Sequence, residues 1–302
     1  MSDSFAAYEP DGSARSPLSA GHVLDLSSAD RQLSAHHGAL FVDGERVYAL
    51  ADTLCVFVGP KVRMTGSVPL ALARHDVVMV NVDGLGRPLA FNTALPGGFR
   101  IASRHRAQRD LSLPRRKSAW QAIVVAKIDG QYAVSRTERL RVLATKVRSG
   151  DPEKVEAQAA REHWAAIRRE VGQADWRRTM QGAEDDLNSR LNYGYAVVRT
   201  AMLRAVLACG LWPALGIEHQ HRENPTPLVD DLIEPFRPAV DRQALACLDA
   251  MSDSEWKHSM VDVLTSSFAT HSTHAEINAF AQQFARYVEG HHERLDPPSL
   301  QT

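Results

Sequence analysis

The hydrophobic pattern of this chain changes once, near residue 98, and that change limits the folds open to it. Before it, short runs rich in β-branched and aromatic residues are separated by turn residues, which is typical of strands. Asp43-Gly44 separates two such runs and predicts a tight hairpin. Beyond residue 100, apolar residues recur at helical spacing. The sequence therefore predicts an α+β protein, with a small N-terminal β-rich domain followed by a larger all-α C-terminal domain.

Individual elements follow from the same patterns. Pro69, with Ala and Leu after it, predicts a short helix at 68–74 among the strands. Asp151, Pro152 and Glu153 are typical of a helix start, because they combine a capping acceptor, a proline at the first position and an acid near the positive end of the dipole. Strands are expected at 22–26, 38–42, 46–50, 53–58 and 76–82, and further helices at 187–209, 243–251, 253–268 and 273–290.

The 302 residues divide into five parts on this basis. Both ends are poor in large apolar residues, which is typical of loosely attached segments. We expect a flexible tail at 1–20, a β-rich domain at 21–98, a basic linker at 99–118, an α-helical domain at 119–295 and a second flexible tail at 296–302.

Charge is distributed unevenly along the chain. The net charge is −1, which excludes a uniformly basic nucleic-acid binder. Residues 99–148, however, hold 13 Lys or Arg and 3 Asp or Glu, a local net charge of +10. Trp120 and Tyr132 are interleaved with these charges. The stretch favours a surface that follows phosphates, although a solvated helix surface would have a similar composition.

Cysteine usage and hydropathy indicate the compartment. Cys55, Cys209 and Cys247 are far apart and form no CxxC pair, which favours a reducing environment. The most apolar stretch, 196–217, contains Arg199 and Arg204. Because a charged residue at the centre of a bilayer costs about 3 kcal/mol, this stretch predicts a buried helix and no membrane span. Residues 1–20 lack an apolar signal region, so we expect a cytoplasmic protein.

The segment 215–238 concentrates acids and histidines beside apolar residues. Asp231 and Glu234 are three positions apart, so on a helix they share a face. Acids held against a core need a partner, and carboxylates with one imidazole suit Mg²⁺ or Mn²⁺ better than structural Zn²⁺. Alternatively, Asp230 and Asp231 only cap the helix that begins there. The candidate ligands of this segment are His219, His221, Asp230, Asp231 and Glu234.

A third acid comes from the helix predicted after Asp151. At about 100° per residue, Glu156 falls near the middle of the apolar stripe of that helix, whereas Glu162 falls on the opposite side. An acid on an apolar face indicates a ligand directed at a site. The alternative is a first-turn residue stabilised by the helix dipole.

Several motifs together resemble the CRISPR-associated adaptation integrase, the universal Cas protein that inserts new spacers, in its type II form. Lys154 stands where the family usually has Asn, and the loop after His219 also departs from the family pattern. The resemblance implies a metal-binding catalytic triad of Glu156, His219 and Glu234, with Asp231 in a supporting role. The motifs are Leu191-Asn-Tyr-Gly-Tyr195, Leu215-Gly216 with His219, Asp230-Asp-Leu-Ile-Glu-Pro-Phe-Arg-Pro238, and Trp120-Gln121 with Ala126-Lys127-Ile128.

The resemblance also implies the reaction and the partners. It implies that the β domain forms a homodimer, that two dimers flank a dimer of a small partner Cas protein, and that the helical domain is catalytic. The expected substrates are double-stranded DNA with single-stranded 3′ ends and the CRISPR repeat, joined by transesterification with Mg²⁺ or Mn²⁺. A general metal-dependent nuclease on branched DNA and a non-catalytic DNA-binding scaffold stay open as alternatives. Candidate phosphate contacts are Arg115, Arg116, Lys117, Arg222 and Arg237.

Overall fold

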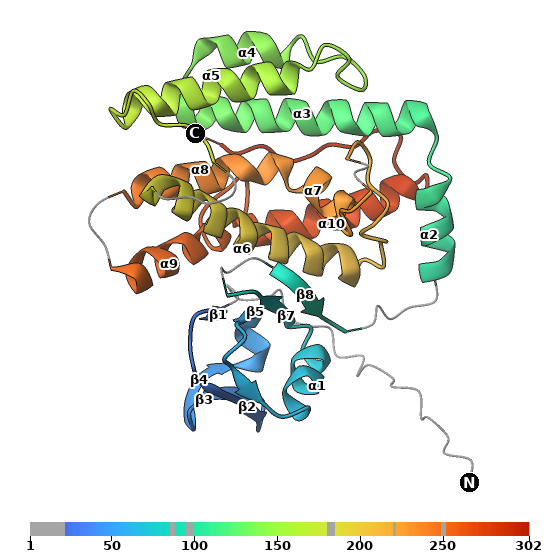
Figure 1. Cartoon of the computed structure of the whole chain (residues 1–302). Coiled ribbons are helices and arrows are strands. Elements are labelled where there is room, and N and C mark those ends of the chain that lie inside the picture. The colour runs from blue at the N-terminus through green and yellow to red at the C-terminus, as the bar shows by residue number, and fades with distance from the viewer. Residues whose placement is uncertain are drawn as a thin grey trace.

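The computed structural model describes residues 22–84, 88–94, 100–179, 185–219, 222–248 and 252–301. In these ranges, a β-rich N-terminal part lies against one side of a stack of helices (Figure 1). The predicted α+β class, with strands first and helices after them, is confirmed. The tail expected at 1–20 lies outside the described residues.

Two four-stranded sheets make up the N-terminal part. The first has the order β1-β5-β7-β8, in which β1, β5 and β7 are parallel and β8 is antiparallel to β7. The second has the order β4-β3-β2-β6. Their strands are β1 (His22–Leu26), β2 (Gln32–His36), β3 (Ala39–Val42), β4 (Glu45–Ala49), β5 (Thr53–Val58), β6 (Arg63–Met64), β7 (Val78–Val82) and β8 (Pro88–Asn92).

The strand predictions are confirmed for five strands, while three others were missed. The hairpin at Asp43-Gly44 is confirmed, with φ of 51° and 86° at its two residues. In β2 only Leu33 is buried, and every residue of β8 is exposed. Such strands carry little of the alternation that a sequence pattern can detect. The third, β6, is a two-residue pairing.

The central strand β5 connects two cores because all six of its residues are buried. Val56 and Val58 pack in the smaller core together with Leu72 of α1 (Ser67–Arg74). Cys55 and Phe57 belong to the main core, which they share with the helices. The first sheet is therefore covered on one face by α1 and the second sheet and on the other by helices.

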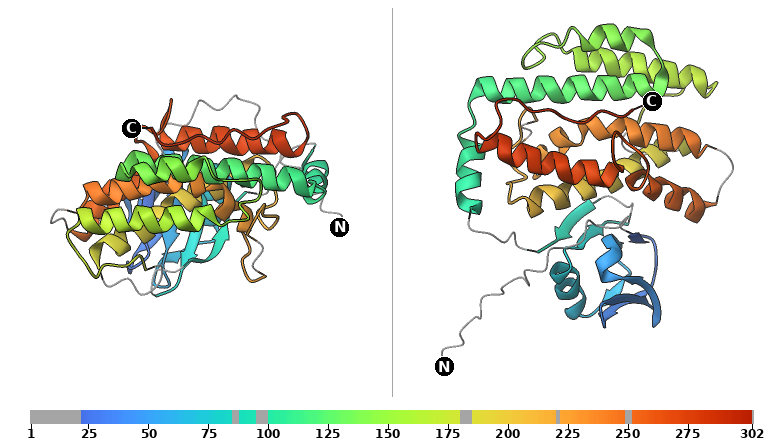
Figure 2. Two further views of the ribbon diagram at one scale, coloured as in Figure 1. Left: turned by 90° about the horizontal axis from the view of Figure 1, so that it is seen from above. Right: turned by 180° about the vertical axis from the view of Figure 1, so that it is seen from behind.

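The helices form layers on either side of one long helix, α3 (Figures 1 and 2). α4 and α5 cover one side of α3, while α8 and the short η2 contact its other side. Residues 99–118, expected as a basic linker, contain α2 and the first turns of α3. Helix bounds are α2 (Ile101–Arg109), α3 (Leu113–Ser135), α4 (Glu138–Ala144), α5 (Val155–Glu170), α6 (Asp186–Ala208), α7 (Pro227–Leu232), α8 (Arg237–Ala246), α9 (Asp253–Val261) and α10 (Thr273–Val288), with the 3₁₀ turns η1 (Leu50–Asp52), η2 (Glu234–Phe236) and η3 (Asp262–Leu264).

The apolar stretch 196–217 behaves as predicted. Most of it belongs to α6, in which Val197, Ala201 and Met202 are buried in the protein core. Across the described ranges, no helix combines the length and the apolar character needed to cross a membrane.

Helix α5 begins later than the sequence pattern predicted. The start expected at Asp151 is wrong, because residues 151–154 form a turn and the helix begins at Val155. The capping function of Asp151 is nevertheless present. Its carboxylate accepts hydrogen bonds from the backbone N–H groups of Val155 at 2.8 Å and Glu156 at 3.0 Å. The cap thus acts from a left-handed residue outside the helix, with φ of 45°.

The C-terminal half differs from the expectation at three further places. The helix expected at 253–268 ends at Val261 as α9 and is followed by the 3₁₀ turn η3. The helix expected at 243–251 begins at Arg237 as α8 and ends at Ala246, while residues 249–251 lie outside the described ones. In place of the flexible tail expected at 296–302, residues 296–301 run along the helices (Figure 2). Leu300 is buried, and the backbone N–H of Gln301 donates to the carbonyl of Phe268 at 2.8 Å. A single buried leucine in a polar segment is too weak a pattern to predict this packing.

A glycine in α6 allows three helices to approach closely. A Cβ atom at Gly194 would lie 2.6 Å from Val240 of α8 and 2.4 Å from the end of Met260 of α9. We expect Gly194→Ala to lower the free energy of unfolding by about 2 kcal/mol, because it overpacks this crossing. Urea denaturation measures the effect, and Gly66→Ala is the control, since a Cβ there meets nothing within 4 Å. Equal stability of the two variants would contradict the prediction.

Candidate functional site

Glu156 lies in the first turn of α5 and is directed at α3. Asp151 fixes the backbone of this turn through the two hydrogen bonds described above. The Glu156 side chain is 27% exposed, and its Oε1 lies 2.6 Å from the ammonium nitrogen Nζ of Lys127. The helix face predicted for Glu156 therefore does point inward. Its contact there is a buried cation of α3.

Glu234 begins the 3₁₀ turn η2 and is almost completely buried. Arg237 Nε donates to its Oε1 at 2.7 Å, and Lys127 Nζ forms an ion pair with its Oε2 at 2.5 Å. Burial by itself would raise the pKa of this carboxyl. The charges of Arg237 and Lys127 more than offset burial and lower the pKa of Glu234 to about 2. Glu234 is therefore an anion at neutral pH.

His219 is held by Asp231, which is completely buried at the end of α7. The Asp231 carboxylate lies 2.6 Å from His219 Nδ1. It also accepts hydrogen bonds from the backbone N–H groups of Ile217, Glu218 and His219 at 2.5, 3.1 and 3.2 Å. The tight turn before them needs Gly216, because a Cβ there would lie 2.4 Å from the carbonyl oxygen of His219. Asp231 therefore fixes the backbone of this loop together with the imidazole of His219, and its supporting role in catalysis stays a prediction.

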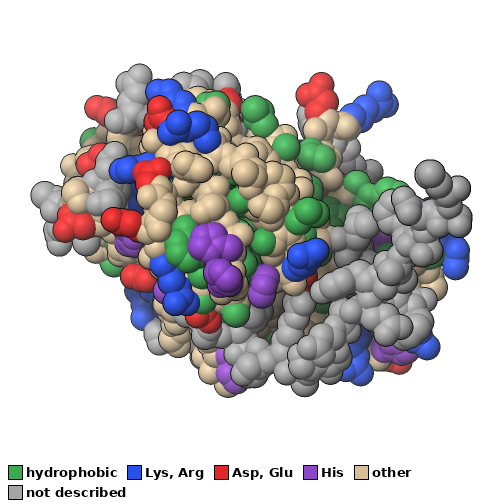
Figure 3. Space-filling model, turned by 90° about the horizontal axis from the view of Figure 1, so that it is seen from below, with side chains coloured by type: hydrophobic (Ala, Val, Ile, Leu, Met, Phe, Trp, Pro, Cys, Tyr) green, Lys and Arg blue, Asp and Glu red, His purple; other side chains and the backbone are tan. Residues whose placement is uncertain are grey.

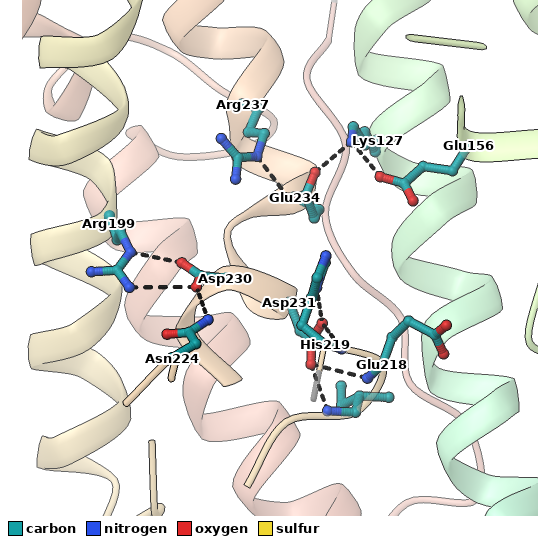
Figure 4. Close-up of polar contacts among 11 residues, drawn as sticks. Lys127, Glu156, Arg199, Glu218, His219, Asn224, Asp230, Asp231, Glu234 and Arg237 are labelled. Atoms are coloured by element: carbon teal, nitrogen blue, oxygen red, sulfur yellow. Dashed lines mark hydrogen bonds and ion pairs between the residues drawn. The ribbon is translucent and has the colours of Figure 1, made fainter. Parts of the chain in front are cut away.

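The contact with Asp231 sets both the charge and the direction of the imidazole. The hydrogen bond with Asp231 raises the pKa of His219 above its ordinary value, against the opposing effect of burial, and the charges of Glu234 and Glu156 add to the increase. Figure 4 shows the ring between Asp231 and Glu234. With Nδ1 bonded to Asp231, Nε2 is the nitrogen that remains for a ligand or a metal.

The three predicted ligands thus lie in one region (Figure 4), Glu156 from α5 and His219 and Glu234 from the segment 215–238. As they stand, no group of three or more His, Cys, Asp or Glu among the described residues is placed to hold a metal ion. The ammonium of Lys127 lies between two of these ligands, Glu156 and Glu234. The donor set itself fits a hard divalent cation, because it offers two carboxylates and one imidazole.

Two residues of this region were missed as site residues by sequence reasoning. Lys127 lies four positions after Ile123 and three after Val124, both buried, so it falls on the apolar face of α3. A charge on an apolar face was the signal used for Glu156, and it would have identified Lys127 too. Glu218 precedes His219, and partial burial and the charge of Asp231 raise the pKa of its carboxyl. The sequence carries no comparable signal for Glu218, because it lies in a bend and not on the apolar face of a helix.

Of the five candidate phosphate contacts, three bind groups of the protein itself and two are exposed to solvent. Arg237 is bound to Glu234 and lies over the ring of Tyr195 at 4.9 Å. Arg115 donates to the carbonyl groups of Tyr287 and His292, so its guanidinium is directed at the end of α10. Arg116 lies 3.4 Å from the carbonyl of Leu111. Lys117 and Arg222 are exposed.

On the face of the N-terminal part away from the helices, Figure 3 shows the basic side chains of the described residues spread among acidic and histidine side chains. The basic stretch 99–148 belongs instead to α2, α3 and α4. Its charges lie on the helical side, where the candidate ligands also are.

The chain is similar to known proteins in both its sequence and its fold. Residues 26–264 match the family model described as CRISPR associated protein Cas1. A CRISPR-associated endonuclease Cas1 of Neisseria meningitidis is 35% identical over 185 residues, which are 59% of this chain and 59% of that protein.

Two solved structures share the fold. One is a casposase bound to integration product, with a TM-score of 0.77 and 19% identity over 91% of this chain and 92% of that chain. The other is a Cas6-RT-Cas1–Cas2 complex, with a TM-score of 0.73 and 17% identity over 95% of this chain and 37% of that one. Since the family model covers most of the chain, from the first sheet to the end of η3, the protein belongs to the Cas1 family of CRISPR-associated proteins.

Proposed function

We propose that this protein is the metal-dependent DNA integrase and endonuclease of CRISPR adaptation, which joins the 3′-OH ends of prespacer DNA to the repeat. One observation supports the proposal: Glu156 of α5 and His219 and Glu234 of the segment 215–238 lie together in the helical part, with Glu156 and Glu234 on either side of Lys127. The curated relative is named an endonuclease, and one structural neighbour holds an integration product.

The proposed reaction is a transesterification at phosphorus. The DNA 3′-oxygen forms a new P–O bond as it loses its proton, the bond to another 3′-oxygen breaks, and that leaving oxygen takes up a proton. When bound, Mg²⁺ or Mn²⁺ would neutralise the negative charge that develops on the phosphate oxygens. Glu156 and Glu234 would hold the ion through carboxylate oxygens and His219 through Nε2. Asp231 keeps the imidazole in that orientation by holding Nδ1.

The proposed assembly uses the N-terminal part at 21–98 for dimerisation and the helical part at 119–295 for catalysis. The edge strand β8 supports the first point, because its residues are exposed and include Leu89 and Phe91. An exposed apolar edge strand is suited to pairing with another chain. We propose a homodimer, two of which bind a dimer of the small partner protein. A structural neighbour is named as a complex that contains Cas1 and Cas2.

Binding of duplex DNA should depend strongly on salt. If six phosphates are neutralised, affinity falls roughly 1,000-fold between about 50 and 200 mM salt. Lys117→Ala should reduce the slope of log affinity against log salt by about one, because Lys117 is exposed in the basic stretch. Lys61→Ala, at an exposed lysine of the N-terminal part, is the control and should leave the slope unchanged. Fluorescence anisotropy measures both slopes, and a flat response would contradict the phosphate contacts.

A strand-transfer assay tests the proposed function as a whole. The full chain and its partner protein are mixed with labelled prespacer DNA and a repeat substrate, with Mn²⁺ or with EDTA. We expect joined product in Mn²⁺ and none in EDTA. Cleavage of branched DNA without partner or repeat would instead indicate a general nuclease. Absence of divalent-metal binding by calorimetry would indicate a scaffold.

A further inference from the structure

A buried ammonium lies between two of the proposed metal ligands. Lys127 Nζ lies 2.6 Å from Glu156 Oε1 and 2.5 Å from Glu234 Oε2, and the lysine side chain is 11% exposed. Arg237 occupies the other oxygen of Glu234. Figure 4 shows Lys127 at the centre of this arrangement, with a glutamate on each side.

The packing of three elements brings the Lys127 ammonium between the two acids. Lys127 is in the interior of α3, which contacts α5 on one side and η2 on the other. Glu156 comes from α5 and Glu234 from η2, so the lysine joins both neighbours of its helix. Two carboxylates that contact the same ammonium repel each other strongly unless a cation lies nearby. Lys127 supplies that cation in the absence of metal.

A divalent ion and the ammonium compete for the same oxygens. Mg²⁺ binds carboxylate oxygens at about 2.1 Å in near-octahedral geometry. An ion held by one oxygen from each glutamate would therefore fall in the space that Lys127 Nζ now fills. The two cations would also repel each other at that distance. Metal binding by Glu156 and Glu234 requires that the ammonium leaves its place between them.

We propose that Lys127 is a positioning residue, an internal counter-ion that holds Glu156 and Glu234 together in the metal-free protein and is displaced when a divalent cation binds. The inference rests on the proposed function, because it takes these acids as the metal ligands. It has two consequences for the protein without DNA. Lys127 stabilises the metal-free fold, and it lowers the apparent affinity for metal because each ion must displace it.

The first experiment measures Mn²⁺ binding to the full chain by calorimetry. We expect Lys127→Met to bind Mn²⁺ at least about tenfold more tightly than the wild type, a difference of one decade in Kd. The same variant should melt at a lower temperature in EDTA, because the two acids lose their counter-ion. Arg199→Met is the matched control. It removes a part-buried cation that pairs with Asp230 at 2.7 Å, and it should leave the Mn²⁺ affinity unchanged.

The second experiment needs no variant and uses the wild-type protein. Amines are acetylated with and without Mn²⁺, and modification of Lys127 is followed by mass spectrometry. If the ion displaces the ammonium, Mn²⁺ should increase acetylation of Lys127. Lys257 is the control. Its ammonium lies 3.5 Å from the carboxylate of Asp25, and its acetylation should be unaffected by Mn²⁺. This measurement decides the question even if Lys127→Met does not fold.

The outcomes separate the inference from the proposed function. Equal Mn²⁺ affinity of the wild type and Lys127→Met, or unchanged acetylation of Lys127 in Mn²⁺, overturns the displacement and leaves the metal site standing. Failure of both proteins to bind Mn²⁺ overturns the metal site and the displacement together. Binding by Lys127→Met alone supports displacement in its strongest form.

Discussion

Replacing Glu156 by glutamine is expected to reduce strand transfer about 1,000-fold while the protein remains folded. The substitution removes one charged oxygen ligand, and a loss of about 4 kcal/mol in stabilisation of the transition state corresponds to that factor. Stability should change little, because the Glu156 side chain is partly exposed and the cap at Asp151 uses only its backbone. The rate is measured with labelled prespacer DNA, and folding by thermal unfolding.

Glu162→Gln is the matched control for this experiment. Glu162 lies on the same helix but pairs with exposed Arg139 at 3.1 Å, so its loss removes only a surface ion pair. We expect strand transfer by Glu162→Gln to stay close to that of the wild type. Full activity of Glu156→Gln would show that Glu156 is not a ligand. Equal loss in both variants would show that the effect comes from α5 as a whole.

Asp231→Asn is expected to have the largest effect on stability, lowering the free energy of unfolding by about 3 kcal/mol. Asp231 is completely buried and receives hydrogen bonds from three backbone N–H groups and from His219. An asparagine offers only one acceptor oxygen there, and its NH₂ group would face donors. Urea denaturation measures the loss.

Asp230→Asn provides the comparison within the same helix. Asp230 is only partly buried and pairs with Arg199 and Asn224, so its loss should cost about 1 kcal/mol or less. A second readout separates orientation of His219 from general stability. Because the bond to Asp231 raises the pKa of His219, that pKa, followed by NMR, should fall in Asp231→Asn and stay raised in Asp230→Asn. Similar results for the two variants would contradict the role given to Asp231.

Much of the fold could be predicted from local pattern. The short strands before residue 98, the hairpin at Asp43-Gly44 and helix α6 follow the periodicity of their own residues. Strand β8 could not be predicted in this way, because its residues are exposed and it exists through pairing with β7. The burial of Leu300 could not be predicted either, because it depends on contacts with helices far away in the sequence.

For the candidate site, too, some features could be predicted from the sequence and others required the tertiary structure. Glu156, His219 and Glu234 were selected from the sequence, because acids on apolar faces and motif spacing are local features; their role as ligands stays a prediction. Only the tertiary structure decided what lies between them. Lys127 reaches both glutamates because α3 is packed between α5 and η2, and no spacing along one chain states which face of one helix meets another. The sequence alone identifies which residues carry reactive or charged groups. Which residue each charge contacts depends on long-range packing, which the periodicity of one segment does not encode.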